Sequence, residues 1–186
     1  YNVIGGLNPN EQEDVYNTIA ISINKTKQFN FSDLKSVYIS DANFETSFSN
    51  KNFKNTTRNN QIAKYIFSKL ERYKHTNDIP SESDLFTIEH ILPDSADENW
   101  GDFDNEAINR SVYRLGNFTL LEKKLNKDAG NLKYSEKEPF YSQSNCKLTT
   151  TLVETYDVWN ESNLSARQRE LAKYAKSIWQ LQFFKE

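Results

Sequence analysis

A short β-prone run, LFTIEHIL at residues 85–92, interrupts a chain whose other apolar residues mostly recur at helical spacing. The run is short and rich in the residue types that strands prefer. A second strand-like run, VYRLGNFTLLE at 112–122, follows a long acidic loop, and the next segment, EKKLNKDAGN, has the charge pattern of a helix that ends at Gly130. Residues 85–130 therefore predict the order strand, long loop, strand, short helix.

Helical patterns flank this segment on both sides. Residues 8–24 have apolar side chains four apart, and residues 58–75 place theirs on a single stripe. In the C-terminal third, Ser165 and Gln168 fit a capping box at the start of a further amphipathic helix. The mixed pattern of residues 29–57 predicts short helices and loops.

These patterns predict one α+β domain that is predominantly helical. We expect residues 85–130 to form its core, with helices in 8–75 and 140–184 around that core. The chain of 186 residues is long enough for one domain with a sizeable interior. It contains no methionine, not even at position 1, which indicates a C-terminal piece of a longer protein.

Composition and charge exclude several classes of protein. With 37% hydrophobic and 26% charged residues the chain is not of a disordered class, and it has no apolar run near the length of a membrane span. The net charge of −3 argues against a generally basic nucleic-acid binder, although a local basic patch could still bind a polyanion. The single Cys146 excludes an intrachain disulfide and a multi-cysteine zinc site, and it suits a reducing cytoplasm.

Four polar residues of the strand–loop–strand–helix segment could meet at one place. Glu89 and His90 lie on the first strand, Asn117 at the second strand and Asn126 on the helix. Adjacent strand residues point to opposite faces, so Glu89 and His90 share a site only if the strand bends or ends there.

Metal-assisted hydrolysis of a phosphodiester needs these residue types. A neutral histidine, with an ordinary pKa of about 6.5, can accept the proton of an attacking water near neutral pH. Mg²⁺ prefers oxygen ligands and keeps several waters, so the carboxylate of Glu89 and the amide of Asn126 can suffice as protein ligands. His90 would then stay off the metal as the general base.

Several motifs in the same order resemble a known family. They are IEHILP, RLGNFTLLEKKLN, the K…Y..S of Lys137, Tyr141 and Ser144, and RQRELAKYAKSIW near the C-terminus. Together they resemble the C-terminal domain of GmrSD-like modification-dependent restriction enzymes and related anti-phage defence proteins, an HNH (His-Me finger) nuclease domain. The resemblance runs from about residue 60 to Trp179, roughly two-thirds of the chain.

The resemblance implies a fold, an activity and a set of site residues. The fold is a ββα-metal motif embedded in a helical domain, and the activity is Mg²⁺- or Mn²⁺-dependent cleavage or nicking of phage or modified DNA in the cytoplasm. It implies His90 and Asn117 as catalytic residues and Glu89 and Asn126 as metal ligands. It also implies that an N-terminal nucleotide-hydrolysing sensor domain precedes this chain in the full protein, and that the chain has no membrane partner.

Several basic residues near the second strand and the following helix could contact DNA phosphates. These candidates are Arg114, Lys123, Lys124, Lys127, Lys133 and Lys137. A solvated helix face explains the lysines equally well. The acidic loop 94–106 would repel DNA, so we place it outside the site. Tyr141, Ser144 and Trp179 are expected to pack rather than to react.

Two other interpretations remain open at this point. One is a DNA-binding or regulatory module with a degenerate site, which would retain DNA without cleaving it. The other is a helical protein-interaction domain in which EHILP is part of the core, so that His90→Ala would lower the melting temperature and no divalent ion would raise it. The simultaneous presence of the histidine, both asparagines and an acid weighs against both.

Overall fold

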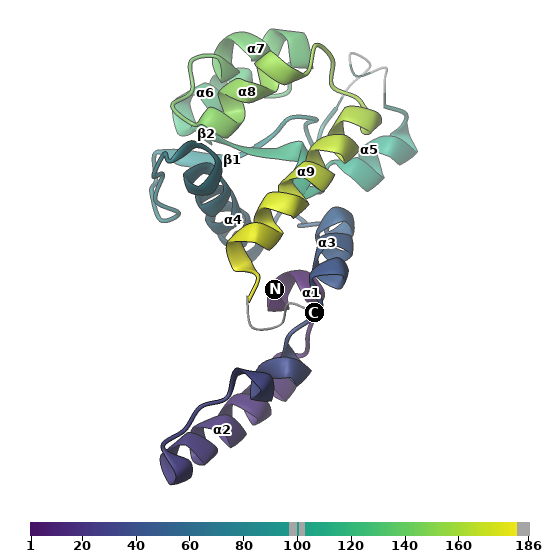
Figure 1. The fold of residues 1–186 in the computed structure, drawn as a ribbon. Coiled ribbons are helices and arrows are strands. Elements are labelled where there is room, and N and C mark those ends of the chain that lie inside the picture. The colour runs from purple at the N-terminus through teal and green to yellow at the C-terminus, as the bar shows by residue number, and fades with distance from the viewer. Residues whose placement is uncertain (97–99, 101–102, 182–186) are drawn as a thin grey trace.

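The computed structural model describes residues 1–96, 100 and 103–181. Helices dominate it, and two strands lie near its centre (Figure 1). The elements, in chain order, are α1 (Asn2–Gly5), α2 (Pro9–Thr26), the 3₁₀ helix η1 (Phe31–Val37), α3 (Asp41–Asn50), α4 (Thr57–His75), β1 (Phe86–His90), α5 (Asn105–Ser111), the 3₁₀ turn η3 (Leu115–Asn117), β2 (Phe118–Glu122), α6 (Lys123–Ala129), α7 (Tyr134–Tyr141), α8 (Lys147–Thr155) and α9 (Glu161–Trp179).

The strands and the helix after them follow the predicted order. β1 and β2 pair antiparallel over their whole length, from Phe86 opposite Glu122 to His90 opposite Phe118. α6 begins at the residue after β2 and contacts both strands. The fold is therefore α+β and predominantly helical, with a ββα unit at its centre, as the sequence predicted.

The second strand is shorter than its sequence pattern indicated. Residues 115–117 form η3 instead of extending β2, and α9 packs directly against this turn. A Cβ atom at Gly116 would lie 2.5 Å from the carbonyl oxygen of Leu164 and 2.8 Å from Cβ of Gln168. Glycine is therefore needed at position 116 because α9 lies too close for a Cβ atom, and not because the backbone has a positive φ angle.

The sheet separates two apolar clusters. One contains Phe118 and Leu120 of β2 together with buried side chains of α3, α4 and α9. The other contains Leu121 of β2, the two residues that follow β1, and side chains from α5 to α9. Because side chains alternate along a strand, each face of this small sheet packs against a different cluster.

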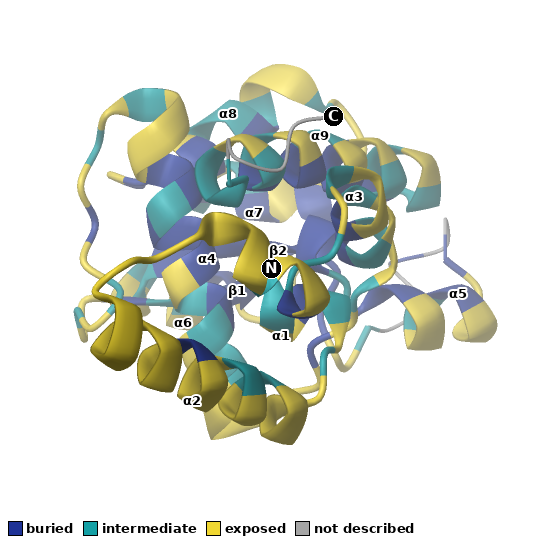
Figure 2. Cartoon of the chain, turned by 60° about the horizontal axis from the view of Figure 1, so that its bottom comes forward, coloured by how far each residue is buried: buried dark blue, intermediate teal, exposed yellow. Residues whose placement is uncertain are grey.

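The helices around the core confirm most of the predicted surround and correct one boundary. Residues 29–57 form short helices and loops, as expected, and α2 with η1 projects from the body (Figure 1). Figure 2 shows that most of α2 is exposed. The capping box at Ser165 is wrong: α9 begins at Glu161, and the side chain of Asn160 caps it by accepting from the amide of Asn163. In the described residues no helix is long and apolar enough to cross a membrane.

Candidate active site on the two faces of β1

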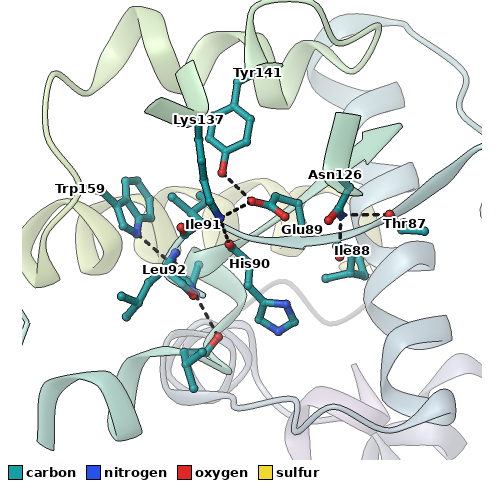
Figure 3. Close-up of polar contacts among 12 residues, drawn as sticks. Thr87, Ile88, Glu89, His90, Ile91, Leu92, Asn126, Lys137, Tyr141 and Trp159 are labelled. Atoms are coloured by element: carbon teal, nitrogen blue, oxygen red, sulfur yellow. Dashed lines mark hydrogen bonds and ion pairs between the residues drawn. The ribbon is translucent and has the colours of Figure 1, made fainter. Parts of the chain in front are cut away.

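Glu89 and His90 point to opposite faces of β1. The strand keeps a regular register with β2 up to His90, so side-chain direction alternates through both residues. In Figure 3 the Glu89 carboxylate lies on the side of α7 and the His90 imidazole lies on the other side of the strand. The strand therefore does not bend to bring the acid and the base together.

The imidazole of His90 is packed and forms no hydrogen bond with the described residues. Its ring meets the rings of Phe118 and Tyr113 edge-on, with centroids 4.5 and 6.1 Å away. Of its two ring nitrogens, Nε2 is buried without a hydrogen-bond partner among the described residues. Burial lowers the pKa of His90 to about 4, although the nearby Asp94 carboxylate opposes this shift. At neutral pH the ring is therefore uncharged, and its lowered pKa makes it a weaker base than a free imidazole.

A polar pocket lies on the His90 face of β1. Its volume is about 310 Å³. The lining residues come from the start of α4, the loop before β1, β1 itself and the start of α6: Asn55, Asn60, Lys64, Asp84, Phe86, Thr87, Ile88, His90 and Lys123. His90 thus stands at a hollow of the surface with amides and ammonium groups around it.

The Glu89 face is closed by α7. Lys137 Nζ lies 2.7 Å from Glu89 Oε1 and donates to it, and the Tyr141 hydroxyl donates to the same oxygen at 2.8 Å. Lys137 also donates to the backbone carbonyls of His90 and Ile91, at 2.9 and 3.2 Å. Burial raises the pKa of the Glu89 carboxyl, and the Lys137 ammonium opposes that shift; burial likewise lowers the pKa of Lys137.

Lys137 is therefore not a phosphate contact, contrary to the sequence-based expectation. Its side chain is fully buried, whereas a contact to DNA needs an exposed ammonium. One feature of the sequence is consistent with the pairing of Lys137 with Glu89. Lys137 and Tyr141 are four residues apart in α7, so both lie on the helix face that contacts Glu89. The tyrosine does pack, as predicted, and it also binds the carboxylate.

Asn117 is a buried clamp on the segment that follows β1. Its Oδ1 accepts from the amide of Leu92 at 2.8 Å and from Nε1 of Trp159 at 3.0 Å. Its Nδ2 donates to the carbonyls of Leu92 and Val112, at 2.8 and 3.0 Å. All of these bonds go to protein groups, so the geometry matches a residue that fixes the loop beside His90.

Asn126 joins α6 to β1 on the Glu89 face. Its Nδ2 donates to Thr87 Oγ1 at 3.0 Å and to the carbonyl of Ile88 at 3.1 Å, which leaves Oδ1 for another partner. Figure 3 shows Asn126 and Glu89 on the same side of the strand, with side-chain oxygens facing the space between them. Lys137 and Tyr141 both donate to Oε1 of Glu89. No described side chain donates a hydrogen bond to the second carboxylate oxygen.

These two oxygens fit the donor chemistry of a hard divalent cation. The described residues hold no group of three or more His, Cys, Asp or Glu side chains that could bind a metal ion. One carboxylate oxygen of Glu89 and the amide oxygen of Asn126 nevertheless suit Mg²⁺ or Mn²⁺, which retain several waters as ligands.

The predicted DNA contacts differ in their surroundings. Arg114 is half-buried, and its guanidinium donates to Gln168 Oε1 at 3.0 Å and to the Ser165 hydroxyl at 3.1 Å. This arrangement ties the turn before β2 to α9. Lys123, Lys124 and Lys127 are exposed on α6, and of these Lys123 lines the pocket at His90. Sequence reasoning missed Lys64, because α4 lies outside the ββα segment to which the candidate residues were confined.

Comparison with known families identifies the family of this chain. The family model of the C-terminal domain of GmrSD restriction endonucleases matches residues 38–174. No curated protein matches the sequence. The matched span covers more than half of the chain and includes the whole ββα unit together with α4, α7 and most of α9. The chain therefore belongs to the family of C-terminal domains of GmrSD restriction endonucleases.

Proposed function

We propose that this restriction endonuclease domain is an HNH-type, metal-dependent DNA nickase in which His90 is the general base. The observation that carries the proposal is the uncharged imidazole of His90, unpaired among the described residues and placed at a polar pocket at the end of β1. A histidine in this state can accept a proton from a water that attacks a phosphodiester. The order β1, β2, α6 with Asn117 beside the strand end further supports it.

Each residue of the site then has a distinct task. His90 would accept the proton of the attacking water on its uncharged imidazole ring. Asn117 holds the chain just after His90 and so keeps the ring in place. Glu89 and Asn126 would hold Mg²⁺ or Mn²⁺ on the other face of β1 from His90, so the cation and the base would meet at one phosphate only where the strand ends, at His90. Lys137 and Tyr141 fix the rotamer of Glu89 by binding Oε1.

The finer aspects of the biology are inferences from the resemblance to the family. We infer that the domain is the effector half of a cytoplasmic restriction or anti-phage system, and that its substrate is phage or modified DNA. A nucleotide-hydrolysing sensor domain would precede it in the full protein. One such centre makes one cut, so the isolated chain should nick plasmid DNA, with double-strand breaks arising from dimers or repeated nicking.

The deciding experiment is plasmid nicking with and without a divalent ion. We expect the wild-type chain to convert supercoiled plasmid to the open-circular form with Mg²⁺ or Mn²⁺ and to stop when EDTA is added. His90→Ala should lower the rate by a factor of about 10²–10⁴, the range typical of general acid–base catalysis. His75→Ala is the matched control, since His75 lies at the C-terminal end of α4, outside the site. A His90→Ala protein as active as wild type would end the proposal.

One contact favours a second function, a DNA-binding module without cleavage. Lys137 already neutralises Glu89 and so competes with a cation for that carboxylate. A degenerate site of this kind would bind DNA but show no cleavage with any divalent ion. Metal-dependent stabilisation of the folded chain separates the two: a melting temperature that rises with Mn²⁺ in wild type, but not in Asn126→Ala, supports the metal site.

A further inference from the structure

The pocket at His90 is built partly by a helix outside the ββα unit. α4 contributes Asn60 and Lys64, and Asn55 precedes that helix. The opposite face of β1 is filled by α7 and the buried pair of Glu89 and Lys137. The space for an anion next to His90 is therefore on the side of β1 that faces α4.

Positive charge in this pocket comes from two separate elements. Lys64 reaches it from α4 and Lys123 from the first residue of α6. Neither forms a salt bridge with an acid of the described chain, and Asp84 is the single described carboxylate among the lining residues. Leaving His90 aside, the two lysines and Asp84 give the lining one more positive group than negative.

Hydrogen bonds hold the donors of the pocket in place. Lys64 Nζ donates to the carbonyl of Ser83 at 2.7 Å, which fixes the ammonium and leaves its other two hydrogens for a ligand. Asn60 Nδ2 donates to Asn55 Oδ1 at 2.9 Å, which turns the Asn55 amide so that its own NH₂ is unused by the described residues. Such pre-positioned donors, aimed from several directions, suit the oxygens of a phosphate.

We propose that this pocket binds a backbone phosphate of the DNA, with Lys64 and Lys123 as its cationic contacts and Asn55 as a neutral donor. The proposal rests on the proposed function and deepens it, because it assigns the substrate to the α4 face of β1. It makes Lys64, rather than Arg114, the phosphate contact next to the base. The exposed Lys124 and Lys127 lie outside the pocket lining and are not part of the contact.

The test measures DNA binding rather than cleavage. A short fluorescein-labelled duplex is titrated with the full chain in EDTA, and fluorescence anisotropy is followed over a range of salt concentrations. Loss of one phosphate contact should flatten the slope of log K against log salt by about 0.9. We expect this change for Lys64→Gln and for Lys123→Gln. Lys64→Arg should keep the wild-type slope because it keeps the charge.

Lys69→Gln is the matched control, because Lys69 lies on the same helix and its ammonium sits over the ring of Tyr65 instead of in the pocket. If Lys64→Gln fails to fold because the bond to Ser83 is lost, Lys123→Gln decides, since Lys123 is exposed. Slopes for the pocket variants equal to that of Lys69→Gln would overturn the inference. So would a wild-type chain that does not bind the duplex.

Failure here and failure of the proposed function give different results. A wild-type chain that nicks plasmid while Lys64→Gln and Lys123→Gln keep the full salt slope removes the phosphate pocket and leaves the nuclease. A wild-type chain that never nicks, yet binds DNA with a slope that both variants reduce, removes the nuclease and leaves the phosphate pocket.

Discussion

Glu89 and His90 are neighbours in β1, but they lie on opposite faces of the strand and in different surroundings. On one face the Glu89 carboxylate is buried and receives hydrogen bonds from Lys137 and Tyr141. On the other face the His90 ring receives none from the described residues and lies at a pocket of about 310 Å³. One face thus satisfies its charge internally, and the other leaves a polar ring available to a ligand.

The difference shows how a small sheet can combine stability with reactivity. A buried ion pair contributes little net stability, since desolvation offsets its attraction, but it becomes costly when one partner is removed. An unpaired buried nitrogen is also unfavourable, and native structures keep such groups mainly where function uses them. The Glu89 face therefore determines the conformation of β1, and the His90 face is where substitutions should affect chemistry more than folding.

The largest expected effect is on the closed face. Lys137→Met leaves the Glu89 carboxylate buried without its cation and also removes donors to two backbone carbonyls. The free energy of unfolding should fall by about 3–5 kcal/mol, as found when one partner of a buried pair is removed. Urea denaturation followed by circular dichroism measures the change. His90→Ala, on the open face, should lose much less stability while losing cleavage.

A double variant separates the structural role of this pair from its role at the metal. Glu89→Leu combined with Lys137→Met replaces two buried charges by apolar groups, so stability should return to near that of wild type. Cleavage should be absent, because Glu89 is a proposed metal ligand. Full nicking activity in the double variant would restrict Glu89 to a structural role. Equal stability of Lys137→Met and His90→Ala would contradict the contrast between the faces.

A medium effect is expected where the two faces meet, at Asn117. Asn117→Ala removes four hydrogen bonds and leaves both backbone groups of Leu92 without this partner. We expect a loss of about 2–3 kcal/mol, because each unsatisfied buried group costs about 1–3 kcal/mol and entering water would recover part of it. The matched control is Asn131→Ala, since Asn131 is exposed after α6.

The same variant tests whether the clamp also positions the base. Loss of the clamp should let the segment after β1 move, so nicking should fall even at a temperature where Asn117→Ala is fully folded. Circular dichroism establishes the folded fraction, and the rate of nicking is compared at equal amounts of folded protein. Wild-type nicking by folded Asn117→Ala would leave Asn117 with a structural role alone.

Local patterns in the sequence predicted the elements but not the partners. The strand at β1 and the helix at α6 follow from residue types and spacing over a few positions, and the structure confirms them. The surroundings of Glu89 depend on Lys137, 48 residues further along the chain, whose charge in a helical pattern looked solvated. A lysine is buried only when tertiary packing brings it a partner, and no local periodicity carries that information.

Packing between distant segments also explains why the sequence did not predict where β2 begins or which residues line the pocket. The run 112–122 reads as a strand, yet α9 packs on Gly116 and its neighbours and turns them into η3. The His90 pocket needs Lys64 from α4, which the motif-based reasoning did not connect with the site. The order of the segments and the resemblance to the family supplied the four central residues. The sequence left open whether β1 bends at Glu89 and His90, and the regular pairing of the strands shows that it does not.

The smallest effect is expected in the apolar cluster on the Glu89 face, and it tests whether a change there reaches His90. Trp159 packs in the second apolar cluster, and its Nε1 donates to Asn117 Oδ1 at 3.0 Å. Trp159→Phe removes this donor but leaves the amide of Leu92 on the same oxygen, so the loss should be about 1 kcal/mol beyond the change in packing. Urea denaturation gives the stability and plasmid nicking gives the rate. If stability falls while the nicking rate stays at the wild-type level, the bond from Trp159 stabilises Asn117 but does not affect catalysis by His90. A rate that falls as far as in Asn117→Ala would instead show that the two faces are coupled through this bond.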